Sequence, residues 1–147
     1  MNDPLREPVT LDLTHRFFGV HVPFLAWLDV RSIRIVPGEA ELELDLRPEL
    51  LNRLAAAHGG VICTLVDIAM AAAARSDNPD SRVVTVDMSV QFLHPGSGTL
   101  KAIGRARKVT RSLAFCEAEV VDQTGELVAR GTGVFKRLKP GRGDGDG

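Results

Sequence analysis

The chain has 147 residues, of which 44% are apolar and 25% charged, and a formal net charge of −1. This length suits one domain, and folding of a chain this size buries roughly 68% of its unfolded surface, enough for a core. The composition excludes wholesale disorder, which needs low hydrophobicity and high net charge. With 18 basic and 19 acidic residues, the charge balance gives no reason to expect a nucleic-acid or membrane-surface partner.

The two ends of the chain differ from its middle. Residues 1–8 are expected to be flexible, and because they lack an apolar signal core we expect no secretion signal and a cytoplasmic protein. Residues 139–147 are Gly-rich and polar, which predicts a disordered tail after a single domain over 9–138. No apolar run reaches the ~20 residues that span a bilayer. Cys63 and Cys116 form no CxxC pair, and we expect two buried thiols.

The first part of the domain predicts a short helix and then a hairpin. Residues 9–20 are expected to hold the helix, with Phe17 and Phe18 on its apolar side. From residue 39 to residue 46, acidic and apolar residues alternate, a period of two that is typical of a half-buried strand with an acidic outer face. Because Pro37-Gly38 is a turn signal, residues 28–36 and 39–47 are predicted to pair as a hairpin.

The segment 60–75, GVICTLVDIAMAAAAR, predicts one long helix. It contains no proline and no glycine after its first position, and the five alanines in its second half favour helix. Apolar residues surround it almost completely, so we expect it to be buried on most sides.

Four strand-like runs follow, at 83–93, 99–109, 113–121 and 126–135. Short turns join most of them, which favours an antiparallel sheet. One long helix against such a sheet predicts an α+β fold. In the first run the apolar residues are expected to share one face: Val84, Val86, Met88, Val90 and Phe92.

The candidate chemistry is concentrated in the segment NRLAAAHGGVICTLVD at 52–67. His58, Gly59 and Gly60 come immediately before the predicted helix, where glycines allow close approach of a ligand to the backbone. The first turn of a helix carries unpaired N–H groups and partial positive charge. That arrangement suits a carbonyl oxygen about to become an oxyanion, so Gly59 and Gly60 are candidate substrate contacts. A plain tight turn would also explain these residues.

Asp67 is the second candidate. It lies two turns into the predicted helix among apolar neighbours, where a carboxylate is costly to bury without partners. One interpretation is a structural aspartate bonded to the backbone or to a nearby cation. The other is a carboxylate held for general-base or nucleophilic work. The residues themselves leave both open.

The pattern Asn52-x5-His58-Gly59-Gly60-x6-Asp67 resembles the signature of hotdog-fold acyl-CoA thioesterases of the PaaI-like (phenylacetic acid degradation) group. Further similarity lies in TVDMSVQFLHP at 85–95 and RSLAFCEAEVVDQTGELVARGTGVF at 111–135, and the resemblance spans about residues 30–137. It implies a hotdog fold, an antiparallel sheet of about six strands wrapped around the 60–75 helix. It also implies a homodimer or homotetramer whose subunits pair edge to edge, with sites at their interface.

The resemblance further implies hydrolysis of acyl-CoA thioesters to free acid and coenzyme A, with no metal or cofactor. Asp67 matches the catalytic carboxylate, as general base or nucleophile, and the backbone N–H of Gly60 would polarise the thioester carbonyl. His58 and Asn52 would help to fix the loop, the thioester and the water. Thr85 occupies the position of a hydroxyl residue that assists the carboxylate. Asp67 would come from one subunit and the glycines from the other.

Other residues are weaker candidates for ligand contacts. Arg107, Lys108 and Arg111 either form a solvated loop or contact the phosphates of coenzyme A, because basic side chains match phosphate charge. Phe24 and Trp27 either pack on the core or line an acyl pocket, and packing is favoured. Two other functions stay open. An enoyl-CoA hydratase of this fold would usually carry a histidine at the position of Ala72, and a non-catalytic acyl-CoA sensor would not need a buried carboxylate.

Overall fold

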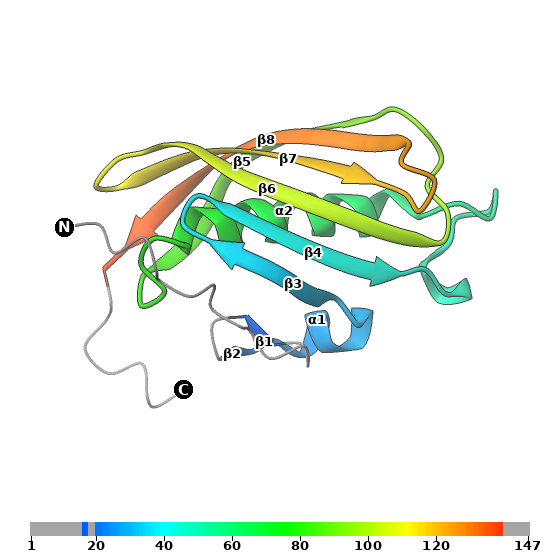
Figure 1. Cartoon of the computed structure of the whole chain (residues 1–147), viewed down its shortest axis with the longest axis horizontal. Coiled ribbons are helices and arrows are strands. Elements are labelled where there is room, and N and C mark those ends of the chain that lie inside the picture. The colour runs from blue at the N-terminus through cyan, green and yellow to red at the C-terminus, as the bar shows by residue number, and fades with distance from the viewer. Residues whose placement is uncertain (1–15, 18–19, 140–147) are drawn as a thin grey trace.

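A six-stranded antiparallel sheet curves around one long helix in the computed structural model, which describes residues 16–17 and 20–139. The strand order is β3-β4-β6-β7-β8-β5, and α2 lies along one face of the sheet (Figure 1). The predicted hotdog architecture is therefore confirmed. The elements are β1 (Arg16–Phe17), β2 (Val20–His21), α1 (Pro23–Leu28), β3 (Arg31–Val36), β4 (Glu39–Asp45), the 3-10 helix η1 (Pro48–Leu50), α2 (Gly59–Arg75), β5 (Arg82–Phe92), β6 (Thr99–Val109), β7 (Leu113–Val121) and β8 (Leu127–Leu138).

The β3–β4 hairpin follows the predicted alternation. Ala40, Leu42 and Leu44 are fully buried on the core face of the sheet, while the acidic residues between them face outward and meet basic residues of the neighbouring strands β3 and β6. Glu41, for example, pairs with Lys101 at 3.1 Å. The acidic outer face of β4 is therefore partly neutralised across the sheet.

The close approach of α2 to the sheet depends on a glycine. A Cβ atom at Gly104 of β6 would lie 2.1 Å from the carbonyl oxygen of Ala69 on α2. Leu65 and Val66, one turn earlier, are fully buried in the same layer. The helix is thus held against the middle of the sheet, which fixes the position of every side chain that α2 presents to β5.

The strand β5 forms an edge of the sheet and pairs only with β8 among the described strands. A bulge between Thr85 and Asp87 adds one residue to it, and this shifts the alternation of faces. The expectation that five apolar residues share one face is therefore wrong. Met88 and Val90 pack against the core, whereas the exposed apolar residues of the strand are Val84, Val86 and Phe92.

The N-terminal prediction is also corrected. Residues 16–17 and 20–21 pair as the two short strands β1 and β2, and the short helix lies at Pro23–Leu28 instead of 9–20. Proline at the first helical position favours this start, because its ring fixes a helical φ and its missing N–H would have no partner there. Residues 1–15 and 18–19, and the predicted tail apart from Lys139, lie outside the described residues.

Candidate functional site

The N-terminus of α2 is capped by the side chain of His58. Its Nδ1 atom accepts a hydrogen bond of 3.0 Å from the backbone N–H of Gly60. The backbone N–H of Gly59, the first residue of the helix, has no acceptor in the part of the chain that the structure describes. An N–H group at this end of a helix adds to the partial positive charge there. The donor available to a ligand is therefore that of Gly59, since His58 occupies that of Gly60.

Asn52 organises the loop that leads into this cap. Its Oδ1 atom accepts hydrogen bonds from the backbone N–H groups of Leu54 at 2.9 Å and of Ala56 at 3.1 Å. Ala55, between them, has a left-handed φ of 58°, a conformation that these bonds help to hold. The side-chain oxygen of Asn52 is thus engaged with its own loop.

Asp67 and Thr85 meet between α2 and β5. The hydroxyl of Thr85 donates a hydrogen bond of 2.7 Å to a carboxylate oxygen of Asp67. Asp67 is half-buried and Thr85 is exposed. The bulge after Thr85 is what turns its hydroxyl toward the helix, because it sets the face of the strand that this residue occupies.

Two cavities flank β5, and each holds half of the predicted site. One has a volume of about 490 Å³ and is lined by Asp67 and Thr85. The other, of about 470 Å³, is lined by Asn52, Gly59 and Phe92. Phe92 closes the second cavity against the helix, since its ring lies 3.6 Å from the position of a Cβ atom on Gly59.

The two half-sites of one chain are too far apart to act on one bond. Asp67 follows Gly59 by eight residues on the same helix, and at 1.5 Å per residue the rise between them is about 12 Å. A reacting carbonyl must lie about 3 Å both from its nucleophile or base and from its oxyanion donor. A single thioester therefore cannot engage the Asp67 carboxylate and the Gly59 N–H of the same chain.

The basic residues lie toward the other end of α2. Arg107 forms an ion pair with Glu117, whose carboxylate accepts a hydrogen bond of 2.6 Å from the Nε atom and raises the pKa of the guanidinium. Lys108 and Arg111 are exposed on the β6–β7 hairpin. In one chain the structure does not bring these three residues to the glycines.

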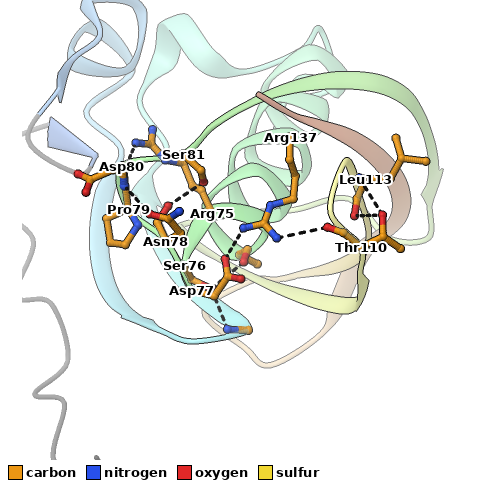
Figure 2. A network of polar contacts seen from close by, with 12 residues as sticks. Arg75, Ser76, Asp77, Asn78, Pro79, Asp80, Ser81, Thr110, Leu113 and Arg137 are labelled. Atoms are coloured by element: carbon orange, nitrogen blue, oxygen red, sulfur yellow. Dashed lines mark hydrogen bonds and ion pairs between the residues drawn. The ribbon is translucent and has the colours of Figure 1, made fainter. Parts of the chain in front are cut away.

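A network of polar contacts fixes that hairpin near the loop that follows α2. Arg137 of β8 binds the carboxylate of Asp77 at 2.9 Å and the carbonyl oxygen of Thr110 at 3.5 Å (Figure 2). Arg75, in the last turn of α2, donates a hydrogen bond of 2.6 Å to the carbonyl oxygen of Pro79. The position of the basic hairpin relative to the C-terminal end of α2 is thus well defined.

Phe24 and Trp27 do not pack in the core, so the favoured interpretation is wrong for both. They are 54% and 57% exposed, while Leu25 and Leu28 of the same helix are buried. Phe24 lines the cavity that holds Asp67. The ring of Trp27 lies 4.8 Å from the guanidinium of Arg47.

Sequence reasoning missed Cys63 as a cavity residue. It was expected to be buried, as Cys116 is, but it is half-buried and lines the cavity beside Asp67. Its spacing of four residues from Asp67 was the available signal, because residues at i and i+4 share a helix face. In the described part of the chain, no group of three or more His, Cys, Asp or Glu side chains is placed to hold a metal ion.

Comparison with known proteins identifies the family. The family model described as the Thioesterase superfamily matches residues 55–129, which include His58, Gly59, Gly60, Asp67 and Thr85. The chain belongs to the thioesterase superfamily. The match to this superfamily also covers the strands β5, β6 and β7 that wrap α2.

Three proteins show the similarity of this chain to known sequences and structures. The protein Rv1847 of Mycobacterium tuberculosis is 32% identical over 82% of this chain and 90% of its own length. Human acyl-coenzyme A thioesterase 13 is 26% identical over 69% of this chain and 75% of its own length. The solved structure of Escherichia coli PaaI, from the phenylacetic acid degradation operon, is 24% identical, covers 88% of this chain and 98% of that one, and has a TM-score of 0.78. Within the described ranges, no helix combines the length and the apolarity needed to cross a membrane.

Proposed function

We propose that this thioesterase superfamily protein hydrolyses acyl-CoA thioesters to a free acid and coenzyme A, at sites that two copies of the chain complete together. The observation that carries the proposal is the pairing of Thr85 with Asp67 in one cavity, while Gly59, whose N–H has no acceptor among the described residues, lines another. The name of the human relative, acyl-coenzyme A thioesterase 13, supports coenzyme A as the thiol.

The exposed edge of the sheet supports a second copy as the partner. β5 is eleven residues long and presents Val84, Val86 and Phe92 at its surface. A long apolar edge strand of this kind invites pairing with another strand. A two-fold axis pairs two copies of one strand antiparallel, so that the same surface is used by both subunits.

The register of this pairing follows from the two half-sites. Thr85 lies beside Asp67 at one end of β5, and Phe92 lies beside Gly59 at the other end. The carboxylate meets the partner's Gly59 if the segment 85–86 lies opposite the partner's 92–93. Residues opposite each other in an antiparallel pair also point to the same face. A pairing centred on Ser89 meets this requirement and places 85–86 opposite the partner's 92–93.

The chemistry needs an attacking oxygen and a site for negative charge. As general base, Asp67 takes a proton from a water molecule whose oxygen attacks the thioester carbon. As nucleophile, its carboxylate attacks that carbon directly, and water then hydrolyses the acyl-enzyme anhydride. In both routes the carbonyl becomes an oxyanion, the carbon–sulfur bond breaks, and the thiolate leaves and takes up a proton. The products are one carboxylic acid and one free thiol.

The oxyanion is proposed to bind the N–H of Gly59 at the start of α2. The prediction placed this role on Gly60, but His58 already accepts that N–H at 3.0 Å. His58 is therefore proposed to hold the helix terminus, and Asn52 the loop before it, so that the Gly59 donor is fixed before substrate arrives. For Gly60 to be the donor, the His58 side chain would first have to turn away.

Lys108 and Arg111 are proposed to contact the phosphates of coenzyme A. Antiparallel pairing of β5 with its partner brings the C-terminal end of one α2 toward the N-terminal end of the other, so the basic hairpin approaches the partner's Gly59. Arg107 is the least available of the three predicted residues, because Glu117 already binds its guanidinium. Lys108 and Arg111 are exposed and carry their charge into solvent.

The test is release of free thiol from acetyl-, hexanoyl-, palmitoyl- and phenylacetyl-CoA by the parent chain and by Asp67→Asn. Loss of the carboxylate is expected to lower kcat by at least ~10²-fold, the lower end for a positioned acid or base. Asp45→Asn is the matched control, since that carboxylate is 60% exposed at its side chain on the distant strand β4. Equal rates for Asp67→Asn and the parent would remove Asp67 from the reaction, and binding without turnover in the parent would indicate a sensor.

A further inference from the structure

We infer that the acyl group taken by this site is apolar and uncharged, and that Phe24 of α1 sets its preferred length; the inference rests on the proposed hydrolysis of acyl-CoA. The cavity beside Asp67 has a volume of about 490 Å³. Apart from the carboxylate and two threonines, its wall consists of apolar side chains and one thiol: Val22, Phe24, Leu25, Cys63, Ile68 and Met88.

The two hydroxyl groups of this cavity already have hydrogen-bond acceptors. The hydroxyl of Thr85 donates to Asp67 at 2.7 Å, and the hydroxyl of Thr64 donates to the carbonyl oxygen of Gly60 at 2.8 Å. No basic side chain lines the described wall. A second carboxylate on the acyl chain would meet the negative charge of Asp67 with no cation on the described wall to balance it. A hydroxyl group would lose its water partners and gain no free donor in return.

Phe24 lies at the open side of this cavity. It is 54% exposed although it is a large apolar residue, which places its ring at the boundary between the cavity and the solvent. An aromatic ring in this position covers the end of an acyl chain that extends from the carboxylate. Each methylene group that reaches the apolar wall should then raise kcat/KM about fourfold, until the chain passes the ring.

The helix that carries Phe24 is held in place from both sides. Leu25 and Leu28 are buried in the core at 7% and 2% exposure. The guanidinium of Arg47 donates hydrogen bonds to the carbonyl oxygens of Leu28 at 2.9 Å and of Trp27 at 2.5 Å. These contacts satisfy carbonyl groups at the C-terminus of α1, which otherwise have no partner within a helix. The position of Phe24 is therefore fixed, and a fixed end of the cavity limits the length of acyl chain that the cavity can cover.

The experiment compares esters that differ in one feature. Butyryl-CoA and succinyl-CoA share a four-carbon acyl group but end in a methyl or a carboxylate, and phenylacetyl-CoA and 4-hydroxyphenylacetyl-CoA differ in one hydroxyl. For the parent chain we expect kcat/KM to be at least about 100-fold higher for butyryl-CoA than for succinyl-CoA. We expect it to be about tenfold higher for phenylacetyl-CoA than for 4-hydroxyphenylacetyl-CoA. Phe24→Ala should lower kcat/KM for octanoyl-CoA at least about fivefold more than for acetyl-CoA. Phe115→Ala, which removes an exposed phenylalanine on β7, is the matched control.

The outcomes separate the inference from the proposed hydrolysis. Turnover of succinyl-CoA as fast as butyryl-CoA would overturn the apolar class and leave the thioesterase activity in place. An equal loss for all esters in Phe24→Ala would overturn the role of Phe24. If the parent chain turns over none of the esters, calorimetric titration of the same chain decides: tighter binding of octanoyl-CoA than of succinyl-CoA supports the apolar pocket without hydrolysis, and equal binding overturns the pocket as well.

Discussion

The side chain of His58 accepts the backbone N–H of Gly60 at 3.0 Å and so closes the start of α2 from within the chain. One donor of the first helical turn is thereby used. Gly59, whose N–H has no acceptor among the described residues, lines a cavity together with Asn52 and Phe92. In this motif His58 and Gly60 thus form the helix cap, and Gly59 keeps a donor that no described residue accepts.

Replacing Gly59 with proline tests directly whether the N–H of Gly59 is the donor. Proline lacks the N–H group, and it is tolerated at the first position of a helix. His58 already has extended backbone angles, with φ −62° and ψ 138°, as a residue before proline requires. We expect Gly59→Pro to lower kcat by about 10²–10³-fold, the effect of losing one oxyanion donor. Gly59→Ala keeps the N–H and is the control, and its added Cβ would meet only Phe92 at 3.6 Å.

Full activity in Gly59→Pro would return the donor role to Gly60. Gly60→Pro completes the comparison, because it removes the N–H that His58 holds. That variant should lose stability through the broken cap, by about 0.5–2 kcal/mol in the free energy of unfolding. Urea denaturation measures this loss separately from kcat.

The hydrogen bond from Thr85 to Asp67 gives a second prediction. Thr85→Val preserves the shape of the side chain and removes the hydroxyl that donates at 2.7 Å. Hydrogen bonds to charged groups contribute about 1.5–3 kcal/mol, so kcat should fall about tenfold or more. Thr85→Ser restores the donor and should recover most of the rate. If valine and serine variants turn over equally fast, the hydroxyl has no part in positioning the carboxylate.

The register of the edge-strand pair is tested by cross-linking. A pairing centred on Ser89 places that residue opposite the partner's Ser89, with Cα atoms about 4.5–5.5 Å apart. This separation lies within the range for a disulfide bond. Ser89→Cys should therefore give a covalent dimer on non-reducing gels after mild oxidation. Ser112→Cys, in the exposed β6–β7 hairpin, should stay monomeric on the same gel. The reverse result would place the interface elsewhere.

Cys116 predicts how stability changes with pH. Burial raises the pKa of its thiol from an ordinary value of 9.0 to about 11. Between these values the unfolded chain releases the thiol proton and the folded chain keeps it, so the free energy of unfolding falls as pH rises. The loss should reach about 1 kcal/mol at pH 10. Urea denaturation at pH 8 and pH 10 measures it, and Cys116→Ala should remove this part of the slope.

Much of the fold could be predicted because its patterns are local. The alternation along β4 and the apolar run of α2 depend only on the spacing of side chains. The bulge after Thr85 could not be predicted, since one extra residue in β5 becomes visible only when β8 provides the register. The prediction that Val84 and Val86 share a face with Met88 is wrong because of that single extra residue.

The candidate site could likewise be predicted from the sequence only in part. Asp67 and the glycines could be found from the motif, because their spacing reflects one helix. The bond between His58 and Gly60 depends on a side-chain rotamer that spacing does not specify. Phe24 was misassigned because the buried face of so short a helix depends on its neighbours, and in the structure Leu25 takes that face.

The rise of about 12 Å between Gly59 and Asp67 along α2 has a genetic consequence. If each site takes its donor from one copy and its carboxylate from the other, damage at either position disables both sites of a homodimer. A chain carrying Gly59→Pro and a chain carrying Asp67→Asn would then complement each other. Random reassortment of the two inactive chains makes half of the dimers mixed, each with one intact site, and so restores about a quarter of the parental activity.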